Sequence, residues 1–92
     1  MFLEIVTPEA SIFSDKVDSV IVPGTTGEFQ MLKDHAPIVS LLQEGKVRIK
    51  GNFSIEEEYQ DKFSKGENDY FVLQINSGTV EMNNNKIIIL VD

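Results

Sequence analysis

The sequence predicts an all-β fold, an antiparallel two-sheet β-sandwich of about ten short strands. Short runs rich in β-branched and aromatic residues recur along the chain, and glycine, proline and asparagine separate them. A helical period is sustained in one segment only, residues 51–68. The 92 residues, of which 41% are hydrophobic, are enough to bury one modest core. We therefore expect a single domain that spans residues 1–92.

The first half of the chain contains clear strand signals. In Phe2–Thr7 the side chains alternate between two faces, with Leu3 and Ile5 on the same one, and a proline ends the run. The segment Val17–Leu32 is interpreted as a hairpin with an exposed tip at Pro23–Gly27, because two β-rich runs flank a turn that contains proline and two glycines.

The second half continues the strand pattern. Ile38–Leu42 is a further expected strand, and Lys46–Lys50 has the period of two that is typical of a half-buried strand. Three β-rich runs separated by turn residues follow: Tyr70–Asn76, Thr79–Met82 and Lys86–Val91. The last two are expected to pair as a hairpin, because three asparagines lie between them and asparagine tolerates a positive φ.

The segment Gly51–Asn68 allows two interpretations. Ser54 and Glu57 have the spacing of a capping box, and apolar residues recur every four positions, at Ile55, Tyr59 and Phe63. This pattern indicates a short amphipathic helix that Gly66 would end. Residues 55, 57 and 59 also alternate with polar neighbours, however, which is equally typical of a charged extension of two strands.

Composition and motifs exclude several functions. Eight Lys and Arg oppose 15 Asp and Glu, and the resulting net charge of −7 disfavours binding to nucleic acid or anionic lipid. No cysteine is present, and no nucleophile or orienting carboxylate motif surrounds His35, the single histidine. The acidic run Glu56–Glu58 lacks the ligand spacing and the glycine turn of a calcium loop. The residues alone indicate an acidic interaction module without catalytic, metal or cofactor residues.

A resemblance adds to this interpretation. The chain resembles the epsilon subunit family of F-type ATP synthases in the order and spacing of Leu3–Glu9, Val20–Phe29 with its PGTTGE turn, His35–Val39 and Gly45. The resemblance resumes at Ser77–Glu81 and at Ile88–Asp92. The resemblance covers most of the chain. It implies a ten-stranded sandwich in the central stalk that links the gamma subunit to the c-ring, couples rotation to ATP synthesis and catalyses nothing itself.

The resemblance also implies contact residues and a location. By matching positions, Thr26, Gly27 and Glu28 would face the polar loops of the c-ring, and the gamma-facing residues would be Thr7, His35 and Ser40. The expected location is peripheral, on the cytoplasmic face of the bacterial inner membrane. A free-standing β-sandwich that binds a ligand or another protein is the alternative, although such ligand sites often use tryptophan, which is absent.

Two departures from the family pattern limit what the resemblance implies. The segment Gly51–Asn68 is longer than the usual connection by roughly fifteen residues. The sequence ends at Asp92, where the family's helical hairpin would follow. The inhibition of ATP hydrolysis and the ATP binding that this hairpin performs in the family are therefore not expected here.

Overall fold

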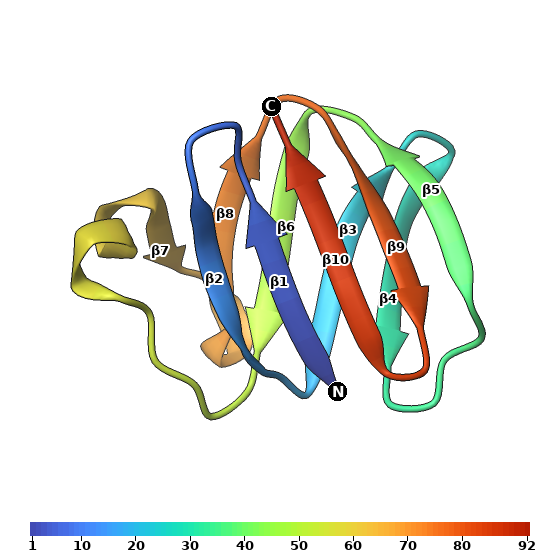
Figure 1. Ribbon diagram of the computed structural model, residues 1–92, viewed down its shortest axis with the longest axis horizontal. Helices are drawn as coiled ribbons and strands as arrows, with labels where there is room; N and C mark the ends of the chain where they lie inside the picture. The colour runs from blue at the N-terminus through green and yellow to red at the C-terminus, as the bar shows by residue number, and fades with distance from the viewer.

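The computed structural model describes residues 1–92 and confirms the all-β fold (Figure 1). Ten strands are accompanied by two short 3₁₀ helices. The strands are β1 Phe2–Val6, β2 Ser11–Lys16, β3 Ser19–Gly24, β4 Gly27–Leu32, β5 Ile38–Leu42, β6 Gly45–Lys50, β7 Phe63–Lys65, β8 Phe71–Ile75, β9 Gly78–Asn83 and β10 Lys86–Val91. The helices are η1 Glu57–Lys62 and η2 Glu67–Asp69.

The strands form two packed layers. One layer has the order β2-β1-β10-β9-β5 and lies toward the viewer in Figure 1. Behind it, β3 pairs with β4 on one side and with β6 on the other, and β8 and β7 continue from β6. The only pairing between the layers is that of Gly24 with Leu42, at one corner, where β3 meets β5. We call the first layer the front layer and the second the back layer.

The core lies between the two layers, where the alternating apolar residues of the strands meet. It contains 19 buried hydrophobic side chains, and those of Leu3, Ile5, Val47 and Ile49 are fully buried. Burial of one such aliphatic side chain contributes about 1.5–3 kcal/mol to folding. The period of two predicted for the first strand and for Lys46–Lys50 is therefore confirmed, as are the two hairpins β3–β4 and β9–β10.

One pairing differs from the expected antiparallel arrangement. Strand β1 runs parallel to β10, with Phe2 opposite Lys86 and Val6 opposite Leu90. All other pairs are antiparallel. The predicted antiparallel β-sandwich is confirmed, with this one parallel pair as an exception. A parallel pair joins strands that are distant in the sequence, and no local turn signal marks it.

The segment between β6 and β8 contains a short helix, as one of the two interpretations allowed, and it is followed by the short strand β7, which pairs with β8. The helix η1 is a 3₁₀ helix that follows Glu56 and has no side-chain cap. The backbone amide of Ser54 instead donates a hydrogen bond to Asp15 Oδ2 on β2, at 3.3 Å, so the predicted capping box does not form. Gly66 does not end this helix; it precedes η2 in an extended conformation.

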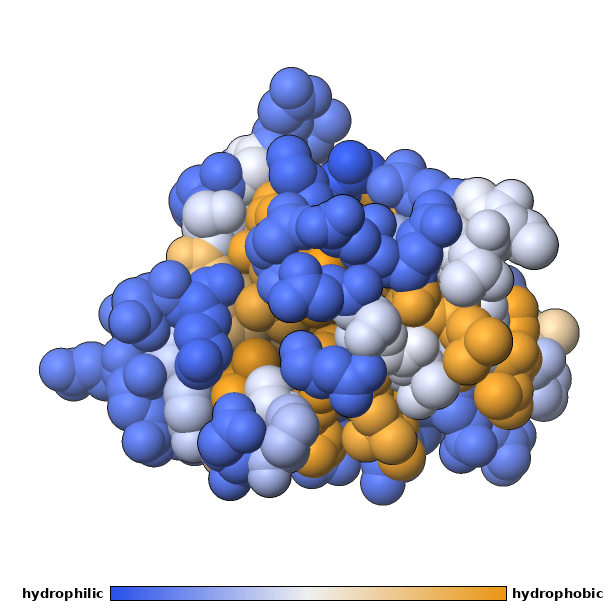
Figure 2. Space-filling view, turned by 90° about the horizontal axis from the view of Figure 1, so that it is seen from above, coloured by the Kyte–Doolittle hydropathy of each residue, from blue (hydrophilic) through white to orange (hydrophobic).

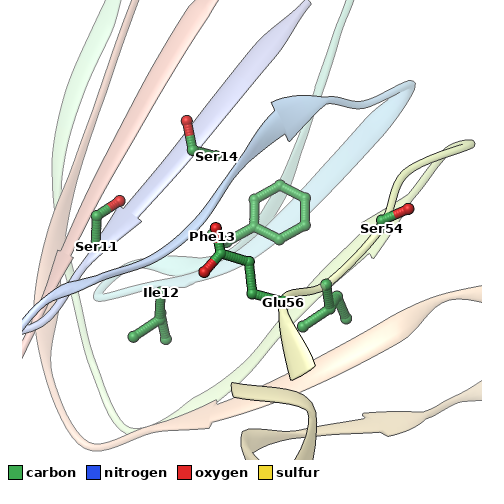
Figure 3. A pocket seen from close by; sticks show the side chains of 7 residues that line it. Ser11, Ile12, Phe13, Ser14, Ser54 and Glu56 are labelled. Carbon is green, nitrogen blue, oxygen red and sulfur yellow. The ribbon is translucent and has the colours of Figure 1, made fainter. Parts of the chain in front are cut away.

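This segment is attached to the core by aromatic packing. The Phe53 ring meets the Phe13 ring edge to face, with centroids 5.0 Å apart, and Phe63 on β7 is buried. Figure 3 shows Phe13 directed from β2 toward residues 54–56, with the carboxylate of Glu56 extending toward β2. The sandwich edge beside β2 and β8 is thus closed by residues 53–63. None of the helices has the length and apolar character of a membrane span.

Candidate protein-docking surface

The predicted hairpin tip is a two-residue turn, Thr25–Thr26, between β3 and β4. Glycine is required on both sides of it. A Cβ atom at Gly24 would lie 2.7 Å from the carbonyl oxygen of Gly27, and Gly27 itself has a φ of +134°. Thr25, Thr26, Gly27 and Glu28 are all exposed. The structure therefore brings the predicted ring-facing residues Thr26, Gly27 and Glu28 together at one protruding turn.

Glu28 carries the only ion pair of the chain. Its carboxylate lies 3.0 Å from a guanidinium nitrogen of Arg48, which reaches it from β6 across β3. The two side chains are 49% and 37% exposed, so the pair contributes little to stability. It orients the carboxylate along the outer face of the back layer.

The three residues expected to face gamma are not brought into one cluster. Thr7 follows β1 at one end of the sandwich, where its hydroxyl donates to the carbonyl of Ala10 at 3.1 Å. His35 precedes β5 at the opposite end, and Ser40 lies within β5 with its hydroxyl donating to the Leu41 carbonyl at 3.1 Å. Strands β10 and β9 separate β1 from β5. Thr7, His35 and Ser40 therefore lie at different places on the front layer and do not contact one another.

The loop that holds His35 is clamped to the β9–β10 turn. The backbone amide of Asp34 donates to Asn85 Oδ1 at 2.6 Å, and Asn85 Nδ2 donates to Asp34 Oδ1 at 2.9 Å. Both residues have a positive φ, which asparagine and aspartate tolerate. His35 Nδ1 donates to the adjacent Ala36 carbonyl at 2.6 Å. The clamp fixes the loop at this end of β5.

Apolar side chains lie on the outer face of the front layer, between these residues. The exposed fractions are 75% for Val39, 63% for Leu41 and 50% for Leu90. The register places Leu90 between Val6 and Thr79, and Thr79 opposite Leu41, so these side chains share one face. Ile88 lies on the same face, two residues before Leu90. We call Val6, Val39, Leu41, Ile88 and Leu90 the apolar strip.

The apolar strip was missed at the level of sequence, although a signal was present. The strand Ile38–Leu42 is apolar at four of its five positions, whereas a half-buried strand alternates with polar residues. Both faces of β5 are therefore apolar: one packs on the core, and the other is suited to contact with a partner protein. In Figure 2 hydrophobic surface interrupts the hydrophilic surface toward the right, the side on which Figure 1 places β5.

The hollow between β2 and residues 54–56 does not gather a set of catalytic side chains. The hollow drawn in Figure 3, about 200 Å³, is lined by serines and apolar side chains with Glu56 as its one titratable residue. No three His, Cys, Asp or Glu side chains lie close enough together to hold a metal ion. The arrangement of turn, clamp and apolar strip suits contact with other proteins.

Comparison with known proteins agrees with this fold. The family described as the β-sandwich domain of the ATP synthase Delta/Epsilon chain matches residues 1–92. An ATP synthase epsilon chain from Chlorobium limicola is 40% identical over 90 residues, which are 98% of this chain and 86% of that protein. An epsilon chain from Campylobacter concisus is 39% identical over 92 residues, all of this chain and 60% of that protein.

Two solved structures share the fold. A chain of the Tetrahymena thermophila mitochondrial ATP synthase, in its central stalk and c-ring structure, superposes with a TM-score of 0.72 at 14% identity. That match covers 99% of this chain and 62% of the other. A chain of the Euglena gracilis mitochondrial enzyme gives 0.73 at 16% identity, covering 97% and 48%.

The fold and the relatives define a β-sandwich of the kind found in ATP synthases. The chain belongs to the ATP synthase Delta/Epsilon chain family, and its relatives from Chlorobium and Campylobacter are epsilon chains. It is a non-catalytic subunit and not an enzyme.

Proposed function

We propose that the chain is a rotor subunit in the central stalk of a proton-translocating F-type ATP synthase. In this role it joins the gamma subunit to the c-ring and couples rotation to ATP synthesis. Membership of the Delta/Epsilon chain family supports the assignment, as do the two structurally similar chains, one from a structure of a central stalk and c-ring and one from a structure that includes F1 and a c-ring. The location that follows is peripheral, on the cytoplasmic face of a bacterial inner membrane.

The observation that carries the proposal is the apolar strip. Val39 and Leu41 are large aliphatic side chains that are mostly exposed, and they share the outer face of the front layer with Leu90, across Thr79 of β9. Exposed apolar side chains gathered on one face favour a protein contact, because leaving them in water has a free-energy cost that burial against a partner removes. We assign the strip to the gamma subunit, with Thr7, His35 and Ser40 along its borders.

The hairpin tip is the second contact of the proposal. Thr26, Gly27 and Glu28 protrude at a turn that glycines and pairing with β3 make rigid, and a rigid turn loses little conformational entropy on docking. A single exposed carboxylate fixes the register against a polar loop more than it adds affinity. We assign this tip to the polar loops of the c-ring.

Binding to a gamma-containing subcomplex tests the proposal. Leu41→Asp introduces a charge into the apolar strip at an exposed position, so the chain should fold while its affinity for gamma falls at least about tenfold. Leu32→Asp is the matched control, because Leu32 is an exposed leucine on β4 in the back layer. Wild-type chain that fails to bind gamma would overturn the assignment.

A further inference from the structure

Glu81 is an exposed carboxylate among the residues of the apolar strip, on the face that also carries Glu4 and Lys86. It is exposed on β9, and the register places it between Val39 on β5 and Ile88 on β10. It makes no ion pair within the chain, whose one ion pair joins Arg48 to Glu28. The nearest comparable residue, Glu4, lies across Ile88 on β1, is half-buried and accepts a hydrogen bond from Ser11 at 3.1 Å.

A hollow adjoins Glu81 at the end of the strip. Its volume is about 320 Å³, and it lies between Pro37–Val39 on one side and Glu81–Asn83 on the other. Four of the six lining residues, Pro37, Ile38, Val39 and Met82, are apolar, and Glu81 is the only charged one. The hollow has room for a side chain of a partner, and its chemistry calls for one that is apolar along its length and positively charged at its end.

We infer that the partner covering the apolar strip presents a lysine or arginine to Glu81, with the aliphatic stem of that residue lying on Val39 and in the adjoining hollow. This inference rests on the proposed function, in which the partner is the gamma subunit. An apolar partner without a cation would bury the carboxylate without a counter-charge from the partner, which is unfavourable. A partner residue with an aliphatic stem and a cationic end covers the apolar side chains and also pairs with the Glu81 carboxylate.

Charge disfavours the other occupants of this face. A second copy of the chain joined by a two-fold axis would use the same patch on both copies and so bring two unpaired Glu81 carboxylates into one interface. Each copy also carries a net charge of −7, which opposes association. An anionic membrane surface is repelled by the same charges.

The test compares charge variants in binding to the gamma-containing subcomplex, by calorimetry or biolayer interferometry. Glu81→Gln is expected to weaken binding about tenfold or more and Glu81→Lys about a hundredfold, because the partner's cation loses its counter-charge or meets a like charge. Glu58→Lys is the control: it makes the same charge change on η1, away from the strip, and should alter the affinity less than about twofold. Thermal unfolding confirms that each variant is folded.

The outcomes separate this inference from the proposed function. If Leu41→Asp abolishes binding while Glu81→Lys binds like wild type, the inference about Glu81 is wrong and the gamma assignment stands. If wild type does not bind gamma at all, both are overturned. Sedimentation shows whether the chain forms a dimer. If wild type is a dimer and Leu41→Asp is a monomer, the apolar strip binds a second copy of the chain, and the inference is overturned.

Discussion

The backbone amide of Thr25 donates a hydrogen bond to the carbonyl oxygen of Leu41, with 3.2 Å between nitrogen and oxygen. Thr25 belongs to the hairpin turn, and Leu41 belongs to the apolar strip. The two proposed docking surfaces are thus joined directly at the corner where β3 meets β5. Force applied at the turn therefore passes into β5 through backbone contacts, without a flexible linker between the two surfaces.

Glu28→Lys is predicted to weaken docking on the c-ring and to leave the fold intact. Glu28 is exposed, and its pair with Arg48 is half in solvent, so the free energy of unfolding should change by less than about 0.5 kcal/mol. Co-purification with detergent-solubilised c-ring measures the docking, and urea unfolding measures the stability. Arg48→Met, which removes the pairing partner but keeps the carboxylate, separates loss of Glu28 from loss of its ion pair. Equal ring binding by Glu28→Lys and wild type would count against the assignment of the tip.

Phe63→Ala is predicted to reduce the free energy of unfolding by about 3 kcal/mol. Phe63 is 9% exposed, belongs to the buried core and packs near Phe13 at a centroid separation of 6.2 Å. The Phe63 end of segment 51–68 therefore belongs to the core, whereas η1 contains no buried residue. Glu58→Ala on η1 should change the stability by less than about 0.5 kcal/mol. If Phe63→Ala has only a small effect in denaturant unfolding, residues 51–68 do not contribute to the stability of the core.

Tyr70→Phe is predicted to cost about 1 kcal/mol of stability. The Tyr70 hydroxyl lies 3.0 Å from Oγ of Ser19, the one buried polar residue, and accepts a longer hydrogen bond from Gln30 at 3.4 Å. This network ties the start of β8 to β3 and β4. Tyr59→Phe is the matched control, because the Tyr59 hydroxyl has no hydrogen-bond partner in the chain and Tyr59 is also half-buried. The network is without effect if both variants unfold at the same denaturant concentration.

The clamp between Asp34 and Asn85 is predicted to show a coupling energy of about 0.5–1.5 kcal/mol in a double-mutant cycle. Glycine is the substitution of choice at both positions, because each has a positive φ that alanine would strain. Asp34→Gly, Asn85→Gly and the double variant are compared with wild type by thermal unfolding. Additive losses would show that the two side chains do not act together.

The parts of the fold that the sequence predicts are those with a local signal. Val47 and Ile49 alternate with basic residues because they face the core while the basic residues face solvent. This period of two predicts the strand at the position where the structure has β6. The hairpin tip follows from glycines whose conformational demands are local. The pairing of β1 with β10 lacks any such signal, since it depends on how distant strands meet.

The candidate site divides in the same way. Glu28 and its neighbours are found because a turn is exposed by its own geometry. The exposure of Val39 and Leu41 is not predicted, because an apolar strand of five residues does not reveal which of its faces the core covers. In Gly51–Asn68 the spacing of Ser54 and Glu57 suits a capping box, yet Asp15 on a distant strand takes the Ser54 amide.

The position of β10 has a consequence for how the chain folds during synthesis. Strand β10 is the bridge between β1 and β9, so until residues 86–91 leave the ribosome the front layer exists only as separate β2–β1 and β9–β5 pairs. Each pair then exposes an open hydrogen-bonding edge beside apolar side chains, which is an aggregation hazard for a nascent chain. The front layer is therefore completed only after translation of its last strand, and a ribosome that stalls before residue 86 would leave a chain for chaperones or proteases to clear.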